Sequence, residues 1–144
     1  MQLLTFIHPG YDNPPVGQEP NWDSPETRSL VERACFDCHS NETKWPWYSY
    51  VFPMSEIIRG DVEKGREVLN FSEWEAGRGD EAAPEQIVDT ISKDQMPLPY
   101  YLILHPEAQL TDAEKGQLIN GLIASISEGE DRLEAEELNQ DEEK

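Results

Sequence analysis

The sequence predicts an all-α domain with long irregular loops. Apolar residues recur at helical spacing in several segments, whereas no segment of convincing length alternates as a strand does. The 144 residues also include 11 prolines and 9 glycines, which indicates many turns between short helices. A chain of this length suits one domain. We expect an irregular lead-in over residues 1–22, a domain over 23–127 and an acidic tail over 128–144.

The first two expected helices carry clear start signals. The first spans residues 24–38 and opens with a capping serine followed by proline at the first helical position. The segment between the first two helices, residues 40–53, is rich in aromatic residues and turns and should be a loop that buries against something. The second helix spans residues 55–69, with a break or bend expected near Gly60 and Gly65.

Two further helices follow a linker over residues 77–83. The third begins at Pro84 and must end before Pro97, because proline disfavours helical backbone at the residue before it. Met96 is therefore expected at a helix exit, followed by a loop over residues 97–101. The fourth helix begins with the capping box TDAE and continues through residues 111–126.

The charge of the chain limits its partners. Thirty acidic residues against 11 basic ones give a formal charge of −19, which argues against nucleic acid or an anionic membrane surface. The acidic tail is expected to be solvated, and its alternative role is a docking arm for a basic partner. No stretch approaches the ~20 apolar residues of a membrane-spanning helix. The short apolar run at residues 3–7 is either the stub of a removed signal or membrane anchor, or a first core segment.

The chemistry is concentrated in the motif CFDCH at residues 35–39, which contains both cysteines of the chain. Two thiols one helical turn apart, followed by histidine, form the attachment motif of c-type haem. Cys35 and Cys38 would bond the two vinyl-derived carbons at one porphyrin edge, and His39 would bind the iron. The other imidazole nitrogen of His39 then needs an acceptor such as a backbone carbonyl. The motif predicts one covalently attached haem c, with both cysteines on the core side of the first helix.

Two other readings of the cysteine pair are weaker. A thioredoxin-like redox pair would require a βαβ pattern around the motif, and none is present. A zinc site would use Cys35, Cys38 and His39 with a fourth ligand such as His105, but three zinc ligands within five residues is an unusual geometry. Iron–sulfur clusters that need four thiolates are excluded within a chain of two cysteines.

Met96 is the preferred candidate for the sixth iron ligand. It follows His39 by 57 residues and precedes Pro-Leu-Pro, a rigid segment able to present the thioether. The alternative is that Met96 only fills a gap in an apolar core. Three other residues remain candidates for the same position, and these are Met54, His8 and His105.

Three blocks of sequence together resemble a known family. CFDCHSNETKWPWYSYVFP, DVEKGREVLNFSEW and QMPLPYYLILHPEAQLTDAE follow in this order within residues 13–123. They are similar to the single-haem "haem-binding domain" family of bacterial c-type cytochromes. The resemblance implies an all-helical, cytochrome-c-like domain wrapped around one covalent haem and exported across the inner membrane, often behind an N-terminal anchor. It also implies Met96 as the distal ligand, opposite His39.

The residues around these ligands supply a candidate haem pocket. Aromatic side chains would wall the macrocycle, while indole, phenol and guanidinium protons would reach its propionates. Plain packing is the alternative role for each of these side chains. The candidates beyond the cysteines are Trp45, Trp47, Tyr48, Arg66, Pro97 and Tyr100.

The expected function is that of a monohaem electron carrier in the periplasm or elsewhere outside the cytoplasm, without enzymatic chemistry. Its partners would be redox proteins, with a basic surface or a membrane-bound electron-transfer complex among them. The alternative is a haem-based sensor or peroxidase-like enzyme in which the distal ligand dissociates. A third hypothesis is a zinc-stabilised interaction module.

Overall fold

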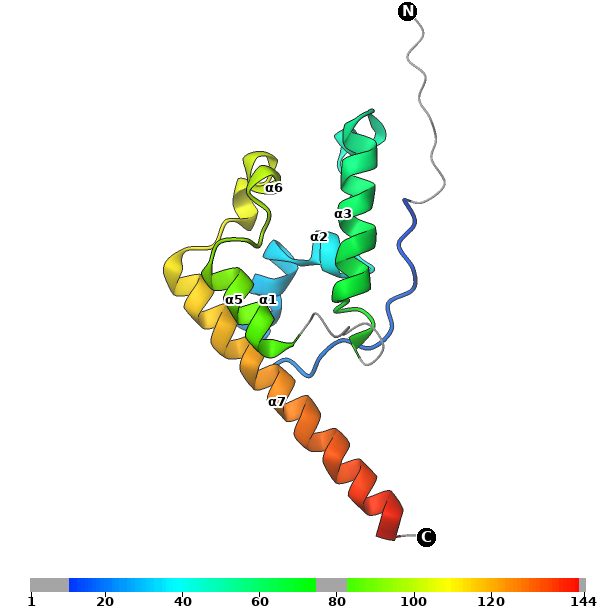
Figure 1. The fold of residues 1–144 in the computed structure, drawn as a ribbon, viewed down its shortest axis with the longest axis vertical. Coiled ribbons are helices and arrows are strands. Elements are labelled where there is room, and N and C mark those ends of the chain that lie inside the picture. Colours follow the sequence, from blue (N-terminus) through cyan, green and yellow to red (C-terminus); the bar gives the residue numbers. More distant parts are fainter. Residues whose placement is uncertain (1–10, 75–82, 143–144) are drawn as a thin grey trace, which may run out of the picture. The chain divides into compact units, whose positions relative to one another are not determined.

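The computed structural model describes residues 11–74 and 83–142, with side chains described as far as residue 127 (Figure 1). These residues form six α-helices and no strand, which confirms the predicted all-α class. Their contacts divide the chain into two units. Among the described residues, unit 1 contains 11–19 and 35–74, and unit 2 contains 20–34 and 83–142.

Unit 2 is built on one long helix. Its elements are α1 (Pro25–Ala34), α5 (Pro84–Ser92), α6 (Pro99–Leu104), the 3₁₀ turn η3 (Pro106–Ala108) and α7 (Asp112–Glu142). Both α1 and α5 pack against α7, and η3 contacts α1 and α6 (Figure 1). Apolar side chains from these elements form the core of the unit, and they are Leu30, Val31, Ala34, Ile91, Ala108, Leu110, Leu118, Leu122 and Ile126.

A glycine allows α1 and α7 to approach each other closely. A Cβ atom added at Gly121 would collide with the side chain of Thr27 on α1, which is 1% exposed. One turn further along α7, the hydroxyl of Ser125 accepts a hydrogen bond from the Asp23 N–H at 3.0 Å. The start of α1 is therefore held against the middle of α7 by packing and by a hydrogen bond.

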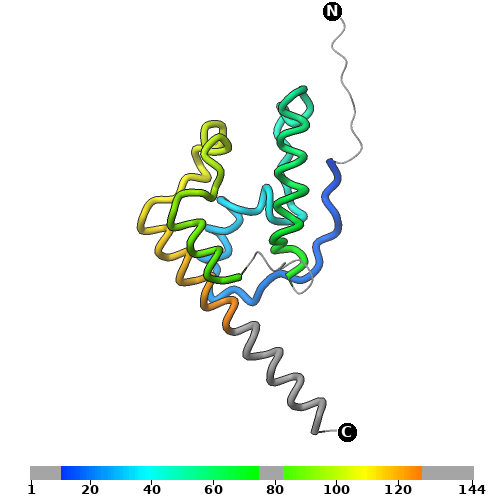
Figure 2. The backbone as a smooth tube through the Cα atoms, in the orientation of Figure 1, coloured from blue at the N-terminus to red at the C-terminus, as the bar shows by residue number. Residues whose placement is uncertain are grey.

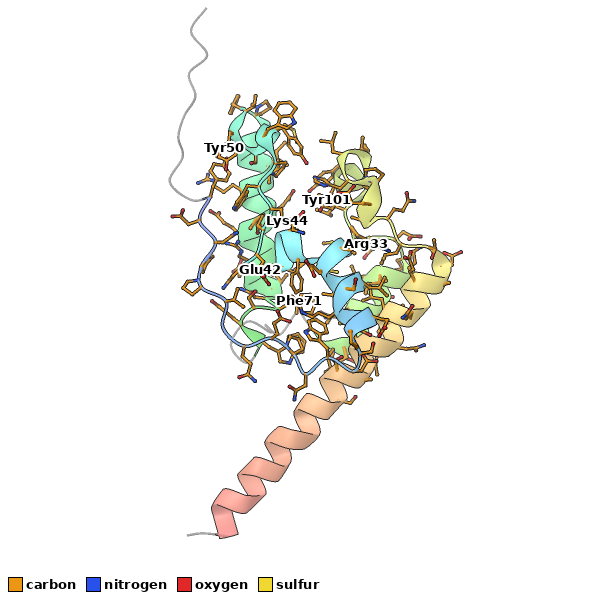
Figure 3. All side chains as sticks on the ribbon, turned by 180° about the vertical axis from the view of Figure 1, so that it is seen from behind. Arg33, Glu42, Lys44, Tyr50, Phe71 and Tyr101 are labelled. Atoms are coloured by element: carbon orange, nitrogen blue, oxygen red, sulfur yellow. The ribbon has the colours of Figure 1, made fainter. Side chains whose placement is uncertain are left out.

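Both predicted capping signals in unit 2 are confirmed. The Ser24 hydroxyl accepts a hydrogen bond from the Thr27 N–H at 3.2 Å, as a helix N-cap does. In the capping box, the Thr111 hydroxyl accepts from the Glu114 N–H at 3.2 Å, and Glu114 Oε2 accepts from the Thr111 N–H at 2.8 Å. Glu114 also binds Arg33, which Figure 3 labels, at 2.6 Å, so that this box ties α7 to α1.

Unit 1 contains the CFDCH motif of residues 35–39. Its elements are α2 (Phe36–His39), the 3₁₀ turn η1 (Trp47–Tyr50) and α3 (Met54–Val68), and α3 packs against both of the others. Figure 3 labels Tyr50, the last residue of η1, and Phe71, in the segment that follows α3. Its buried apolar side chains are Phe36, Val62, Leu69 and Phe71.

Residues 11–19 of the lead-in before α1 belong to unit 1 and are hydrogen-bonded to it. The Gly17 N–H donates to the Ser72 oxygen at 2.9 Å, and the Trp74 N–H donates to the Gln18 oxygen at 2.9 Å. Residues 11–19 thus run beside the segment that follows α3 (Figure 2). The sequence predicted that this stretch is irregular, and it did not predict that the stretch covers residues 70–74.

Several expected boundaries were wrong. The first helix ends at Ala34, because the chain turns at Cys35 (φ −126°) before the separate helix α2. The second runs from Met54 to Val68 without the expected break at Gly60 or Gly65. Of the expected loop over residues 97–101, residues 97–98 precede α6 and residues 99–101 form its first turn, since Pro99 occupies a first-turn position.

The remaining expectations concern the middle and the end of the chain. The third helix ends at Ser92, before Pro97 as predicted. The expected linker over residues 77–83 lies outside the described residues, except for Ala83, the N-cap of α5. The backbone of α7 continues as helix into the acidic segment and ends at Glu142. Among the described helices, none combines the length and the apolar composition needed to cross a membrane.

Candidate functional site

The two cysteines and His39 lie on a single turn. The N–H groups of Cys38 and His39 both donate to the Cys35 oxygen, at 3.2 and 2.9 Å. Cys35 precedes α2 as its N-cap residue, and His39 ends the helix. Cys35 and Cys38 are both half-buried as residues.

The two residues between the cysteines fix this turn to its surroundings. Phe36 is 3% exposed, and its ring stacks on Phe71 with 6.0 Å between the centroids. Asp37 Oδ1 accepts a hydrogen bond from the Lys44 N–H at 2.9 Å, and the Asp37 oxygen accepts from Thr43 Oγ1 at 2.8 Å. One residue therefore anchors α2 in the core, and the other shapes the loop after it.

The imidazole of His39 donates to the end of α3. Its Nδ1 atom lies 2.9 Å from the Gly65 oxygen and 3.1 Å from the Leu69 oxygen, which confirms the predicted carbonyl acceptor. Because both partners can only accept, Nδ1 carries the proton and the lone pair is on Nε2. Burial lowers the pKa of His39, which also favours the neutral ring. A neutral imidazole with Nδ1–H bound to a carbonyl is the form in which histidine binds a metal ion.

Gly65 is the residue that lets α3 reach the haem motif. A Cβ atom at this position would collide with the Cys38 oxygen and would lie 3.0 Å from the Cys38 carbonyl carbon. These are backbone atoms, which cannot move aside without displacing α2. The same glycine also accepts from His39, so one residue provides both the close approach and the hydrogen bond. The sequence drew attention to Gly65 only as a weak point in the helix.

A buried polar network holds the backbone around His39. Asn41 is 2% exposed, and its Oδ1 accepts from Asn70 Nδ2 at 2.9 Å. The Asn41 N–H donates to the hydroxyl of Ser72 at 2.9 Å, and its Nδ2 donates to the Pro15 oxygen at 2.9 Å. Between these contacts, the His39 oxygen accepts from the Phe71 N–H at 2.8 Å. Sequence reasoning missed this network, because Asn and Ser in a loop are usually solvated.

The thiols are strongly protonated in this environment. Burial raises the pKa of Cys35 to about 12. Burial likewise raises the pKa of Cys38 to about 12, and the nearby carboxylates of Asp61 and Asp37 add to the effect. A thiol redox pair requires an accessible thiolate, so these pKa values count against that reading. Over residues 11–74 and 83–127, no group of three or more His, Cys, Asp or Glu side chains could hold a metal ion.

The candidate wall residues of unit 1 differ in their surroundings. Trp45 is half-buried and contacts the Tyr11 ring edge-to-face at 4.8 Å, and its indole nitrogen is buried without a partner among the described residues. Trp47 is 77% exposed and packs on the half-buried Tyr48 at 5.7 Å. The aromatic loop is thus buried only in part, although the sequence predicted that it must bury against something.

Arg66 has structural partners within unit 1. Its Nε donates to the Ser40 oxygen at 2.8 Å, and Nη2 donates to Asn13 Oδ1 and Thr43 Oγ1, both at 2.9 Å. The guanidinium therefore ties α3 to the loop after His39 and to the lead-in. Its suggested contact with a haem propionate stays a prediction.

The candidate distal ligands lie on different elements. Met54 is the first residue of α3 in unit 1, and Met96 lies between α5 and α6 in unit 2; both are half-buried. The ring of His105 stacks on Tyr101 at 4.2 Å, and its Nδ1 contacts Glu107 Oε1 at 3.0 Å. His8 lies outside the described residues.

Two further candidate wall residues belong to unit 2. Pro97, next to Met96, is half-buried, and Tyr100 is 46% exposed on α6. No side chain of α6 is buried, although the helix is strongly apolar, and Ile103 and Leu104 are 77% and 55% exposed. Helix α6 therefore presents apolar surface of the kind that packs against a ligand or a partner.

The residues of unit 1 fit a covalently attached haem. Two thiols one turn apart offer the attachment points, and the Nδ1–H tautomer of His39 offers Nε2 to an iron ion. Exposed apolar side chains in the same unit offer surface that could cover a porphyrin. They are Trp47, Tyr50, Val51, Phe52 and Ile57.

Gly65→Ala should destabilise the protein by about 1–3 kcal/mol, the usual range for overpacking, because the new methyl group meets the Cys38 backbone. Gly60→Ala is the matched control on the same helix. No atom lies within 4 Å of its added Cβ, so this variant should gain up to about 1 kcal/mol from helix propensity. Urea unfolding followed by circular dichroism measures both effects. Equal stability of the two variants would contradict the close approach of α2 and α3.

Comparison with known proteins gives one match. The family model described as "Haem-binding domain" matches residues 1–124, which include all the described candidate site residues. Neither the curated proteins nor the solved structures gave a match.

Proposed function

The chain belongs to the haem-binding domain family, and from this premise we propose that it is a monohaem c-type cytochrome that carries single electrons between redox partners outside the cytoplasm. In this proposal Cys35 and Cys38 hold the haem through thioether bonds. His39 and Met96 are the two axial ligands of the iron. The haem would supply a one-electron couple, and the protein would perform no substrate chemistry.

The observation that carries the proposal is the hydrogen bonding of His39. Its Nδ1–H donates to the Gly65 and Leu69 oxygens, which fixes the plane of the ring and directs Nε2 away from α3. The His39 backbone is held as well, since its oxygen accepts from the Phe71 N–H. A ligand held at both its ring and its backbone changes little between redox states, which suits electron transfer.

Met96 is proposed as the distal ligand on two grounds. A thioether opposite an imidazole fills the coordination of the iron and raises its reduction potential relative to two imidazoles. Of the alternatives, Met54 begins α3, where helix packing accounts for its position, and His105 is already stacked on Tyr101.

A covalent haem predicts resistance to extraction. The wild-type protein should retain its haem in acidified acetone, because thioether bonds survive this treatment. Cys35→Ser and Cys38→Ser should each retain haem through the remaining thioether, whereas the double variant should release it completely. The absorption of the protein pellet in alkaline pyridine measures the outcome. Release of haem from the wild-type protein would contradict covalent attachment.

Met96→Ala should abolish the thioether-to-ferric-iron charge-transfer band and lower the reduction potential, because the iron loses a sulfur ligand. Met54→Ala is the control and should leave both unchanged. Visible spectroscopy and a redox titration measure these properties. Survival of the band in Met96→Ala would contradict ligation by Met96 and make Met54 the ligand to test. Rapid and complete binding of carbon monoxide by the reduced wild-type protein would favour the alternative, a sensor or peroxidase-like enzyme.

The net charge of −19 predicts a partner with a basic surface, which a membrane-bound electron-transfer complex could present. Small redox reagents of opposite charge test the electrostatic part of this proposal. Electron transfer with cationic hexaammineruthenium should slow as salt is added, whereas transfer with anionic ferricyanide should accelerate. Stopped-flow rates over a range of ionic strength measure the contrast. The same salt dependence for both reagents would remove this argument for a basic partner.

A further inference from the structure

The segment that carries Met96 is fixed to the end of α5 by its backbone. Successive N–H groups at residues 93–96 donate to carbonyl oxygens in the last turns of this helix. Those of Gln95 and Met96 both donate to the Thr90 oxygen, at 3.0 and 3.4 Å. The main chain of Met96 is therefore bound back to α5, although α5 itself ends at Ser92.

Asp94 makes the reversal of the chain possible. Its φ angle is 55°, and within the described part of the chain it is the one residue other than glycine with a positive φ. Such backbone is costly for most side chains and tolerable for aspartate and asparagine. A residue in this conformation persists when its surroundings hold it there. Here it lies two positions before Met96.

Lys115 on α7 holds Asp94. Its ammonium nitrogen lies 2.6 Å from Asp94 Oδ1 and 3.4 Å from Asp112 Oδ1. The Lys115 side chain is only 21% exposed, although that of Asp94 is 71% exposed. The lysines of two other ion pairs, Lys93 and Lys64, are 60% and 63% exposed, so the ammonium group of Lys115 is the better shielded from water. The contact joins two elements, because Asp94 follows α5 and Lys115 is on the first turns of α7.

We infer that Asp94 and Lys115 are positioning residues for the thioether of Met96. This inference rests on the proposed function, in which Met96 is an iron ligand. The ion pair keeps the left-handed turn at Asp94 closed, and the closed turn limits the conformations open to the Met96 backbone. Because less conformational freedom is then lost when the sulfur binds iron, the pair strengthens ligation without touching the metal.

The chain contains a matched ion pair without this geometry. The ammonium group of Lys93 lies 2.8 Å from Asp89 Oδ2. Lys93 is the C-cap residue of α5 and Asp89 belongs to that helix, so this pair joins no second element. Their side chains are 60% and 55% exposed, which is typical of pairs that contribute little. A general effect of surface charge near Met96 would appear in both pairs, whereas a positioning effect belongs to Asp94 and Lys115 alone.

Imidazole binding to the ferric, haem-loaded protein measures the strength of methionine ligation, because imidazole must displace the sulfur. Lys115→Met and Asp94→Asn should each raise the affinity for imidazole by about two- to fivefold, the range expected from one partly shielded ion pair. Lys115→Arg should keep the wild-type affinity for imidazole, since it keeps the positive charge. Asp89→Asn and Asp112→Asn should match wild type, because both leave the Lys115–Asp94 contact in place.

Amide hydrogen exchange of the same proteins provides a second readout. In Lys115→Met the N–H groups of Gln95 and Met96 should exchange faster, while those inside α5 should be unchanged. Unchanged exchange, or equal imidazole affinities for Lys115→Met and Asp89→Asn, would overturn the inference. An imidazole affinity of Lys115→Arg as high as that of Lys115→Met would overturn the inference too. If Met96→Ala leaves both the charge-transfer band and imidazole affinity unchanged, the proposed ligation itself fails instead.

Discussion

The neutral imidazole of His39 has one proton to donate, and two carbonyl oxygens at the end of α3 lie within hydrogen-bond distance of it. The Gly65 oxygen also accepts from the Leu69 N–H at 3.0 Å, whereas the Leu69 oxygen belongs to the C-cap residue of α3, beyond the hydrogen bonds of the helix itself. The ring thus adds a donor to the last turn of α3, and the two carbonyl groups fix the tautomer of the ring. The haem motif and α3 depend on each other through this contact.

The contact also explains the polar core of unit 1. His39 can reach the Gly65 oxygen only if α3 lies against the Cys38 backbone, and only glycine leaves room for that. The loop after His39 and the segment after α3 are then brought together, and Asn41, Asn70 and Ser72 satisfy each other's polar groups at their junction. Such a network gives directional constraints that apolar packing lacks, which suits a ligand whose orientation matters.

Local signals in the sequence predicted much of this fold, and long-range contacts account for what they missed. The capping serine at position 24, the TDAE box and the prolines at 84 and 97 act over a few residues, so their helices were found. Gly65 was misjudged because its helix propensity is poor, whereas its value comes from an approach to Cys38 that is remote in sequence. A backbone carbonyl acceptor for His39 was predicted from the sequence, but only the structure identified the Gly65 and Leu69 oxygens as the acceptors. Helix α6 was not predicted, because Pro97 and Pro99 were read as loop residues, whereas Pro99 begins this short apolar helix.

The two proposed ligands are supported by different physical means. His39 is held by buried hydrogen bonds to backbone, whose loss would leave unsatisfied groups inside unit 1 and would disturb its core. Met96 is held by a left-handed turn and by an ion pair whose aspartate is 71% exposed, and such contacts can break without unfolding a helix. If one ligand is to be released, Met96 is therefore the one whose support can be lost at small cost. A support of Met96 that depends on the exposed Asp94–Lys115 pair would also permit the alternative function, in which Met96 leaves the iron and an external ligand binds in its place.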